Sequence, residues 1–451
     1  MSQDSNYIVA KFGGTSVADY DSMLNCFNII NSDPNVRVVV LSASAGVTNL
    51  LVELASGCDT ERRKEIIEKI RIIQFNIINR LQFPEEIAQR IESCLNHISS
   101  LSEAASLSTN EALAAAIVGH GELMSTMIFT HLCKEQGARA EYLDARDVIK
   151  TNANFSEAQV ILERTLENAD KVLSLLADHE AKIITQGFIG QEEEGKTTLL
   201  GRGGSDYSAA LFAEVIKAKA CHIWTDVAGI YTTDPRIVPN AKRIETISFK
   251  EASEMAIFGA KVLHPATILP AVRADIPVFI GNSKDPKAGG TWISKNVDNP
   301  PTFRGVAFKR NQSILTISSL RMLGASGFLS KVFSIFSKYN VVIDCVTTSE
   351  VALAVTVDHK QNQGHGSLNN PELLAELHEL GSVKIEHDYS LIALIGNKLS
   401  QTSGLSKALQ ALDNCTFRMV CQGASDYNIC FLVPAEKADS TIIQLHKNLF
   451  E

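Results

Sequence analysis

Residues 199–220, LLGRGGSDYSAALFAEVIKAKA, set an arginine, an aspartate and three glycines directly before a pattern typical of an amphipathic helix. Ser205 or Asp206 would cap that helix, and capping is the purely structural interpretation of the stretch. Capping does not require Arg202 or the glycines at 201, 203 and 204, which suit a backbone folded around an anion beside the positive end of a helix dipole. The stretch therefore favours an anion site, with the structural turn as the alternative.

A lysine and two glycines follow the first predicted strand, in IVAKFGGTSV at residues 8–17. Glycines let backbone N–H groups approach a phosphate closely, and Lys11 at the strand end adds a mobile cation. A tight strand-to-helix turn with a solvated lysine would explain the same residues. The next strand ends in LSASAGVTN, residues 41–49, again with small hydroxyl residues and glycine. In open α/β sheets, ligands bind at this carboxyl edge.

Three further stretches carry polar residues that, taken singly, are ordinary. HGELMS at 120–125 places Glu122 in an apolar helical region, where a local partner would explain it. TDVAGIYTTDPR at 225–236 is a polar loop after a strand, and FGAKVLHP at 258–265 contains Lys261 and His264. Each stretch could be a plain loop or a buried pair, so none assigns chemistry alone.

One motif is misleading. GQEEEGKT at 190–197 fits the phosphate-loop pattern G-x-x-x-x-G-K-[ST] letter by letter. Its three glutamates would place negative charge where phosphates must bind, and TTLLG after it reads as a strand rather than the required helix. We therefore predict a polar hairpin turn there.

The elements that must position these residues alternate between strand-like and helical patterns from residue 6 to about 295, which indicates βαβ units on a mostly parallel sheet. Residues 60–136 are almost entirely helical in periodicity. Residues 281–303, dense in Gly, Pro, Asn and Lys, are the best boundary candidate. After them, βαββαβ patterns recur twice, which predicts two tandem ferredoxin-like modules.

Composition excludes several classes of protein. At 451 residues, with 45% hydrophobic and 21% charged residues, the chain should fold as a globular protein of two or three domains. A net charge of -9 argues against a nucleic-acid surface. The nine cysteines are scattered without a C-x-x-C, which disfavours a disulfide framework and a zinc site. Without a recognisable signal peptide or an apolar run of about 18 residues, we expect a cytoplasmic protein with no membrane partner.

Taken together, seven ordered motifs closely resemble those of the aspartate kinases of the amino acid kinase family. They are KFGGTSV, LSASAGVTN, HGE, TQGFIG, GRGGSDYSAA, WTDVAGIYTTDPR and GAKVLHP. The stretch MLGASGFLSKVFSIFSKYNVVIDCVTTSEVALAV is most similar to the lysine-sensitive, monofunctional branch, although GAS at 324–326 departs from the usual bulkier, more polar sequence.

The resemblance implies an α/β fold with an amino acid kinase-like, mostly parallel open sheet carrying helices on both faces. Two ferredoxin-like (βαββαβ) ACT modules would follow it. The implied domains are a catalytic domain at 1–295, a first ACT module at 310–388, and a second at 389–451 together with the linker 296–309.

The implied reaction uses ATP to phosphorylate the side-chain carboxylate of L-aspartate. By resemblance, Lys11, Arg202 and Asp206 are catalytic. The aspartate-binding residues would be Ser42, Thr48, Glu122, Arg202, Gly203, Gly204 and Ser205. The ATP-binding residues would be Lys11, Gly13, Gly14, Thr225, Asp226, Tyr231, Arg236 and Lys261. Mg²⁺ would arrive with ATP, and no protein metal cage is expected.

By the same resemblance, the ACT modules would bind L-lysine as a feedback inhibitor and join two chains into a homodimer. The implied effector contacts are Met322, Ala325, Phe328, Leu329, Val342, Ile343, Asp344, Ser349 and Glu350. Modules that only stabilise a dimer are the alternative. For the whole chain, two other functions stay open: another acyl-phosphate-forming amino acid kinase, or a catalytically silent amino-acid sensor.

Overall fold

The computed structural model describes residues 6–178, 180–260, 263, 265–360, 362, 364–412 and 415–451. Contacts divide the chain into two compact units. Unit 1 comprises residues 1–230, 245–249 and 262–297, and unit 2 comprises residues 231–244, 250–261 and 298–451.

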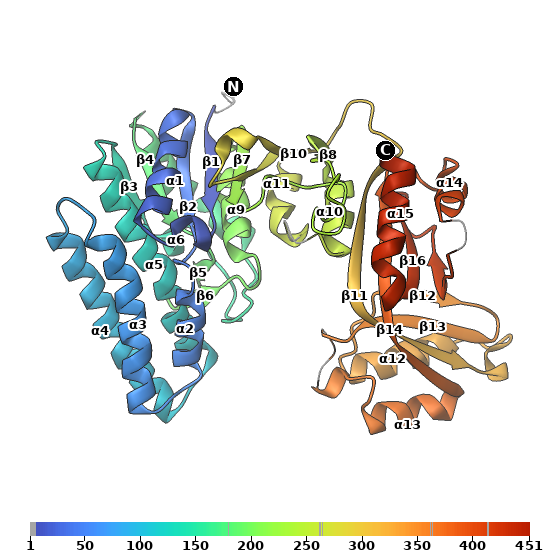
Figure 1. Ribbon diagram of the computed structural model, residues 1–451. Helices are drawn as coiled ribbons and strands as arrows, with labels where there is room; N and C mark the ends of the chain where they lie inside the picture. The colour runs from blue at the N-terminus through green and yellow to red at the C-terminus, as the bar shows by residue number, and fades with distance from the viewer. Residues whose placement is uncertain are drawn as a thin grey trace. The chain divides into compact units, whose positions relative to one another are not determined.

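Unit 1 is built on an eight-stranded sheet in the order β3-β4-β2-β1-β7-β9-β10-β8 (Figure 1). Its pairs are parallel except for β9 with β10. Every residue of β2 is buried, as expected for an apolar run covered on both faces. The strands are β1 (Ile8–Phe12), β2 (Val36–Leu41), β3 (Ala140–Leu143), β4 (Lys182–Gln186), β7 (Ala220–Thr225), β8 (Thr246–Ser248), β9 (Val278–Asn282) and β10 (Gly290–Ser294).

Helices flank this sheet, with α5 packed on β2, β3 and β4, and α9 packed on β1, β2 and β7. The mostly parallel α/β fold expected from the sequence is confirmed. The helices of this unit are η1 (Gly14–Val17), α1 (Tyr20–Ser32), α2 (Val47–Ala55), α3 (Thr60–Ile78), α4 (Glu85–Leu107), α5 (Glu111–Glu135), α6 (Ala145–Val148), α7 (Leu162–Glu167), α8 (Ala169–Leu176), α9 (Gly204–Val215), η2 (Pro265–Ile268), α11 (Leu269–Arg273) and η3 (Pro286–Ala288).

Helices α3, α4 and α5 form the helical excursion that periodicity predicts for residues 60–136, and Figure 1 shows them side by side. Asp59 caps α3 by accepting a hydrogen bond from the backbone N–H of Arg62. Among the described helices, α5 alone is long and apolar enough to cross a membrane, but 67% of its apolar window is buried within the protein. This burial is what the core helix of a folded domain shows.

The segment 190–197, which matches the phosphate-loop pattern and is called here the pseudo-phosphate loop, forms the predicted hairpin. Strands β5 (Ile189–Gln191) and β6 (Thr197–Leu199) pair antiparallel. The turn between them is held by Glu192, whose carboxylate accepts hydrogen bonds from the backbone N–H groups of Glu194 and Lys196. The acidic turn is therefore structural.

The boundary candidate 281–303 is only partly a linker. Gly290–Ser294 forms β10, which pairs antiparallel with β9 and parallel with β8. The short alternation in TWIS was hidden by the turn-forming residues around it. The Cβ of any larger residue at Gly290 would lie 2.2 Å from the backbone oxygen of Ile280, so this close pairing needs glycine.

Unit 2 contains a six-stranded antiparallel sheet in the order β12-β13-β11-β14-β16-β15. Its two central strands, β11 and β14, are long enough to serve both repeats: the first half of β11 pairs with the second half of β14. The strands are β11 (Phe303–Ser318), β12 (Cys345–Thr348), β13 (Ala352–Asp358), β14 (Ser382–Gly396), β15 (Met419–Cys421) and β16 (Asn428–Pro434).

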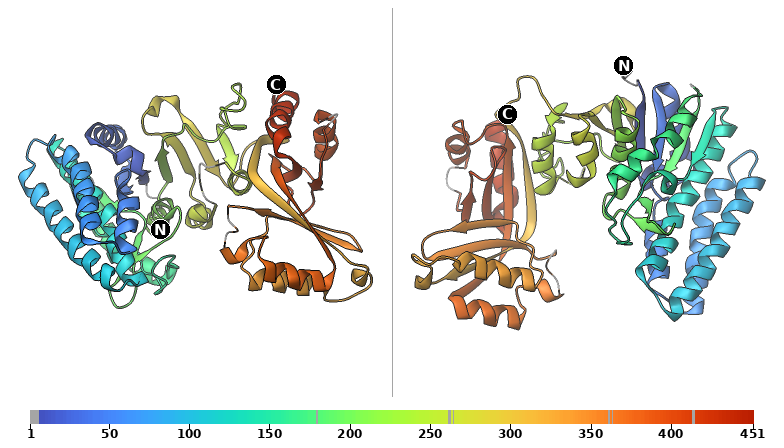
Figure 2. Two further views of the ribbon diagram at one scale, coloured as in Figure 1. Left: turned by 60° about the horizontal axis from the view of Figure 1, so that its bottom comes forward. Right: turned by 180° about the vertical axis from the view of Figure 1, so that it is seen from behind.

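Two helix pairs cover opposite ends of these strands, as Figures 1 and 2 show. One core packs beneath α12 and α13 around Val332, Phe336 and Leu373. The other packs beneath α14 and α15 around Phe431 and Leu445. The helices are η4 (Leu320–Met322), α12 (Phe328–Lys338), η5 (Gly364–Gly366), α13 (Pro371–Leu380), α14 (Gly404–Ala411), η6 (Ala435–Lys437) and α15 (Ala438–Phe450), together with most of α10 (Phe249–Ile257).

Two segments that precede the boundary in sequence are packed into unit 2, namely 231–244 and 250–261. Val238 belongs to the core under α14 and α15. The buried hydroxyl of Thr232 lies 2.9 Å from Nε2 of His446 in α15. A buried ion pair joins Arg304 Nε to Glu251 Oε1 at 3.0 Å. These segments are therefore part of the structural unit that carries the two repeats.

Candidate active site

The candidate site of unit 1 lies at one edge of its sheet. Strands β4, β2, β1 and β7 are neighbours and parallel, so their carboxyl ends meet at the same edge. Lys11, Ser42, Gly187 and Asp226 are located at or just beyond these four ends. The topology thus brings together residues that are far apart in the sequence, at the edge where open α/β sheets bind ligands.

Lys11 and Asp206 form an ion pair, with Nζ 2.7 Å from Oδ1 and only 11% and 16% of the side chains exposed. Asp206 stands in the first turn of α9, where a carboxylate is favoured by the helix dipole. A side chain at Gly13 would begin 3.6 Å from Lys11 Nζ. The lysine is therefore held in place by a carboxylate beside a glycine turn.

The start of α9 differs from the capping interpretation, which is wrong for this helix. The helix begins at Gly204, and its N-cap is Gly203, in the left-handed region at φ 72° with no side-chain cap. Gly201 is also left-handed, at φ 73°. Neither Ser205 nor Asp206 caps, because two glycines make the turn that a side chain would otherwise stabilise. Asp206 is left available to Lys11.

Arg202 projects from this turn. Its side chain is exposed, and it has no ion-pair partner among the residues that the structure describes. An arginine fork next to a helix N-terminus is a planar donor suited to a carboxylate or a phosphate.

A residue that the sequence analysis did not single out fixes the position of α9. Any Cβ at Gly187 would lie 2.5 Å from Cβ of Ser205, so only glycine allows this approach. Phe188 follows in the left-handed region at φ 68°, and its N–H donates to Ser208 Oγ at 3.0 Å. The sequence signal for this contact is a glycine directly after a strand, in TQGFIG at 185–190.

The loop after β2 contacts the turn after β1 and the helix α5. A Cβ at Gly14 would lie 2.8 Å from the backbone oxygen of Ala43. The backbone oxygen of Ser42 accepts a hydrogen bond from Ser125 Oγ at 2.8 Å. Thr48 stands in the first turn of α2, half-buried like Ser42. The small residues of this loop let three elements converge.

Glu122 is a buried carboxyl group in the middle of α5, with 3% of the residue exposed. One oxygen accepts a hydrogen bond from the backbone N–H of Ala43 at 3.2 Å. The other has no hydrogen-bond partner in the described structure. Desolvation by burial raises the pKa of Glu122 to about 8, against the lowering effect of the Ala43 hydrogen bond. A local partner was the structural explanation for Glu122, and in the described structure its carboxylate is bound by one backbone amide, that of Ala43.

The end of β7 is tied to the end of β9. Thr225 Oγ1 donates to Asp226 at 3.1 Å, and the backbone oxygen of Thr225 accepts from the backbone N–H of Ser283 at 2.9 Å. The hydroxyl of Ser283 lies 2.7 Å from that of Ser16, which follows Gly13 and Gly14. Ser16 and Ser283 therefore brace the glycine turn after β1 against the ends of β7 and β9, a role that their sequence context did not reveal.

Three other residues that the resemblance implies for nucleotide binding are not among those described at the sheet edge of unit 1. Tyr231 and Arg236 belong to unit 2, where Arg236 forms a forked ion pair with Asp234, Nη2 to Oδ2 2.7 Å. This pair lowers the pKa of Asp234, chiefly through the side-chain hydrogen bond from Arg236. Lys261 and its neighbour His264 fall outside the described residues.

The residues implied for the effector lie in unit 2 around α12, β12 and the segment before it. Phe328 is buried, and Met322 and Ile343 pack against the same core. Val342 is 52% exposed and Leu329 37% exposed. Ser349 closes the turn between β12 and β13 through its hydroxyl, which accepts from the backbone N–H of Ala352 at 3.1 Å. Ala325 and Glu350 are exposed.

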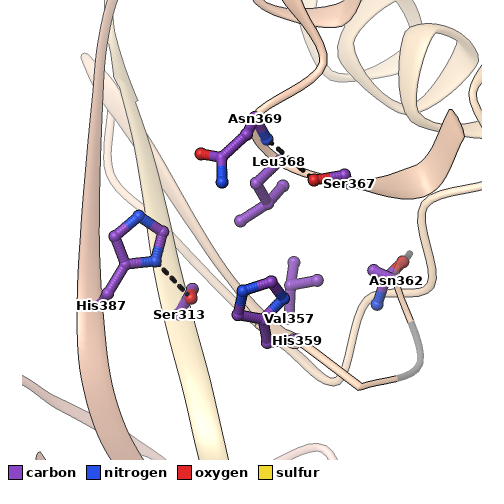
Figure 3. Close-up of a pocket in the computed structure, with 8 residues that line it drawn as sticks. All are labelled: Ser313, Val357, His359, Asn362, Ser367, Leu368, Asn369 and His387. Carbon is purple, nitrogen blue, oxygen red and sulfur yellow. Dashed lines mark hydrogen bonds between the residues drawn. The ribbon is translucent and has the colours of Figure 1, made fainter. Parts of the chain in front are cut away.

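Asn362 holds the backbone of this effector segment. Its Oδ1 accepts from the N–H of Val342 at 2.6 Å, and its Nδ2 donates to the oxygen of Val342 at 3.0 Å. Asn362 lines a small pocket with His359, and with His387, whose Nδ1 lies 2.8 Å from Ser313 Oγ (Figure 3). Across the described chain, no three His, Cys, Asp or Glu side chains are grouped to hold a metal, so we do not interpret this pocket as a metal site.

Comparisons with known proteins agree with the fold. The model of the amino acid kinase family matches residues 6–282, and an ACT domain model matches residues 392–449. The lysine-sensitive aspartokinase 3 of Escherichia coli (strain K12) is 52% identical over 450 residues, which cover 99% of this chain and 100% of the relative. The chloroplastic aspartokinase 1 of Arabidopsis thaliana is 34% identical, over 98% of this chain and 80% of its own length.

Two crystal structures of E. coli aspartokinase III are similar to the whole chain, each covering 99% of it and 100% of the matched chain. The complex with lysine and aspartate, described as the T-state, superposes with a TM-score of 0.86 at 52% identity. The complex with aspartate and ADP, described as the R-state, has a TM-score of 0.84 at 51% identity.

Proposed function

This chain belongs to the amino acid kinase family, among the aspartokinases, and on that premise we propose that it is a lysine-sensitive aspartate kinase. It transfers the γ-phosphoryl group of ATP to the side-chain carboxylate of L-aspartate, giving ADP and 4-phospho-L-aspartate, the first step toward lysine, threonine and methionine. The observation that carries this proposal is the Lys11–Asp206 pair at the sheet edge, with Arg202, which has no ion-pair partner among the described residues, on the turn next to it.

The chemistry needs positive charge more than it needs a base. The side-chain carboxyl group of aspartate has a reference pKa near 3.9 and is already ionised at neutral pH. The barrier is the approach of one anion to another and the charge that develops on the transferred phosphoryl oxygens. Fixed cations and N–H donors lower that barrier, and Lys11 and Arg202 supply the cations.

On the ATP side, Lys11 holds the β- and γ-phosphates, and Gly13 and Gly14 present backbone donors. Asp206 positions Lys11 rather than accepting a proton, which agrees with the 2.7 Å ion pair. The remaining nucleotide contacts are carried over from the family pattern alone: Thr225, Asp226, Tyr231, Arg236 and Lys261.

On the aspartate side, Arg202 binds the α-carboxylate and Glu122 binds the α-ammonium group. The uncommitted oxygen of Glu122 supports this role, because a buried carboxylate with one hydrogen bond gains most from an incoming cation. The other residues assigned to this subsite are Ser42, Thr48, Gly203, Gly204 and Ser205.

Mg²⁺ is the divalent ion that we assign to the reaction, bound through the phosphates of ATP. Hard oxygen ligands suit it, and it commonly keeps several waters when it is bound by nucleotide phosphates. The carboxylate of Asp226 at the end of β7 is exposed and of the right chemistry to meet it. An ion held there would supply positive charge that neutralises part of the charge on the phosphates.

The tandem ACT modules bind L-lysine as a feedback inhibitor, with Asp344 taking an ammonium group of the effector. Inhibition of this kind needs a coupling free energy of about 1–3 kcal/mol between the two sites. We also propose that unit 2 joins two chains into a homodimer, and that the protein works in the cytoplasm.

The decisive experiment measures ADP release from ATP with L-aspartate, L-glutamate or no amino acid, each with and without L-lysine. We expect turnover with aspartate alone, suppressed by lysine and not by threonine. A preference for glutamate would identify a different acyl-phosphate-forming kinase. No ADP release from a folded, lysine-binding protein would identify a sensor.

A further inference from the structure

The carboxylate assigned to the effector is already bound by a lysine of this chain. Lys309 Nζ lies 2.6 Å from Asp344 Oδ1, and 15% and 10% of the two side chains are exposed. Lys309 comes from β11, and Asp344 directly precedes β12, where its backbone N–H donates to the oxygen of Thr356 at 2.9 Å. The backbone of Asp344 is thus fixed by the sheet while its side chain is fixed by Lys309.

The second oxygen of Asp344 is buried and has no hydrogen-bond partner among the described residues. An ionised carboxylate offers about four acceptor positions, so this oxygen is an unused acceptor in a place shielded from water. A buried acceptor without a partner is costly, and a new donor that reaches it gains that cost back. Asp344 therefore favours a further cation or N–H donor.

The Lys309–Asp344 pair differs from an exposed ion pair of the repeat that carries Asp344. Lys338 and Glu376 pair with 60% and 33% of their side chains exposed, and such surface pairs contribute little. Lys309 stands where the register of β11 against β14 shifts, and Asn311 nearby is in the left-handed region at φ 58°. A shift of this kind re-aims the side chains next to it. Lys309, next to this register shift, makes a nearly buried contact.

We propose that Lys309 is an internal competitor of the effector and sets the concentration at which lysine inhibits. The proposal rests on the proposed function, which assigns an ammonium group of the effector to Asp344. The incoming ammonium group of the effector meets a carboxylate that is already paired with the ammonium group of Lys309. The two cations repel each other in a site where water screens them poorly. The effector's ammonium group can reach the free Oδ2 while Lys309 stays on Oδ1, and the repulsion between the two cations lowers the apparent affinity.

The test uses the full chain with Lys309→Met. Without Lys309, Asp344 lacks a cation, so lysine should bind about tenfold more tightly by calorimetry and should inhibit ADP release at a concentration about tenfold lower. Turnover without lysine should be unchanged. Lys309→Arg, which keeps a cation, should retain the sensitivity of the unmodified protein. The matched control, Lys338→Met, removes an exposed pair of the repeat that carries Asp344 and should change neither constant.

A second variant distinguishes this proposal from the assignment of the effector's ammonium group to Asp344, on which it rests. Asp344→Asn should abolish the response to lysine. If Asp344→Asn responds normally, the assignment of the effector to Asp344 is wrong and the proposed regulation fails. If Asp344→Asn loses the response while Lys309→Met binds lysine no more tightly than before, Asp344 is the effector ligand and Lys309 is not its competitor. Should Lys309→Met not fold, Lys309→Gln decides by the same two measurements.

Discussion

Lys11 is the residue whose loss should most affect turnover, because it is a nearly buried cation held by the carboxylate of Asp206 at the sheet edge. We expect Lys11→Ala to lower kcat by about 10²–10³, the range for removing one preorganised donor that stabilises developing charge. Steady-state ADP release measures it. Lys196→Ala is the matched control: this lysine completes the pseudo-phosphate loop, pairs with Glu194 and is 55% exposed, so kcat should not change.

Arg202 should separate the two substrates. Its loss removes a charge-assisted contact worth about 1.5–3 kcal/mol, so Arg202→Ala should raise KM for aspartate by about 10- to 100-fold and leave KM for ATP much less affected. Arg236→Ala is the opposite control, since that arginine is assigned to the nucleotide. Equal increases in both KM values for Arg202→Ala would contradict its placement on the aspartate side.

Glu122 should make aspartate binding depend on pH. Burial raises its pKa to about 8, so at pH 7 the carboxyl group is mostly protonated before the substrate arrives. An ammonium group beside it favours the ionised form. Binding of aspartate at pH 7 should therefore release up to about one proton, and binding near pH 9.5 almost none.

Calorimetry at pH 7 in two buffers of different ionisation enthalpy counts these protons, and Glu122→Gln should abolish the release. Equal binding heats in the two buffers at pH 7 would contradict the role given to Glu122.

The raised pKa of Glu122 also affects the stability of the folded protein, in a fixed direction. The folded-state pKa is raised above the unfolded value of about 4.5, so the folded protein binds the extra proton between roughly pH 4.5 and 8, and this group's contribution to stability falls as pH rises through that window.

The sequence predicted the charged side chains of the candidate site better than it predicted the contacts that hold the surrounding turns and helices in place. Lys11, Arg202 and Glu122 stand out because a charged residue beside glycines, or inside an apolar helix, needs a reason. Gly187 and the bracing pair Ser16–Ser283 do not stand out, since close approach and long-range hydroxyl contacts depend on which strand ends are neighbours. Capping by Ser205 or Asp206 was wrong because propensity favours those residues while two left-handed glycines make the turn.

At the scale of elements, the position of α9 depends on one glycine. A methyl group at Gly187 would overlap Ser205, at 2.5 Å from its Cβ, so Gly187→Ala should displace the turn that carries Arg202 and Asp206. Overpacking of this kind costs about 1–3 kcal/mol. We expect kcat/KM for aspartate to fall at least about tenfold, as measured by ADP release alongside thermal unfolding.

Gly190→Ala is the matched control for this displacement. Its added methyl would lie 2.8 Å from Cγ2 of Thr151, a similar overlap, but in the β5–β6 hairpin rather than against α9. Both variants should be destabilised, and only Gly187→Ala should lose activity beyond the loss of folded protein. Equal kinetic losses in the two variants would mean that general destabilisation explains the effect.

Sequence periodicity was enough to locate most helices and strands, but it could not show which neighbouring strand segments form one continuous strand. The end of the first βαββαβ pattern and the start of the second form one continuous strand, β14 (Ser382–Gly396), and the first strand of the first pattern is the second half of β11, which ends at Ser318. A bulge permits that continuity: the β11–β14 register shifts near Lys309 and Gln312. Since a long strand that serves two repeats has the local pattern of two short ones, only the pairing partners distinguish them.

At the scale of the whole molecule, unit 2 leaves large apolar side chains uncovered, including Leu320 at 83% and Leu323 at 59% exposure. Contiguous exposed apolar surface commonly marks an interface. We expect the chain to sediment at twice its own mass, and Leu320→Lys to shift it toward the monomer. Leu107→Lys, at a residue 87% exposed in unit 1, should leave the sedimentation unchanged. A monomer at micromolar concentration would contradict the homodimer.

The packing of residues 231–244 and 250–261 into unit 2 also limits how such proteins can be recombined. A chimera that joined two aspartokinases within residues 281–303 would take Val238 from one parent and its core from the other, and it would mismatch Thr232 with His446 and Glu251 with Arg304. A viable crossover therefore lies upstream of residue 231, so that the regulatory half is inherited together with the stretch of catalytic sequence folded into it.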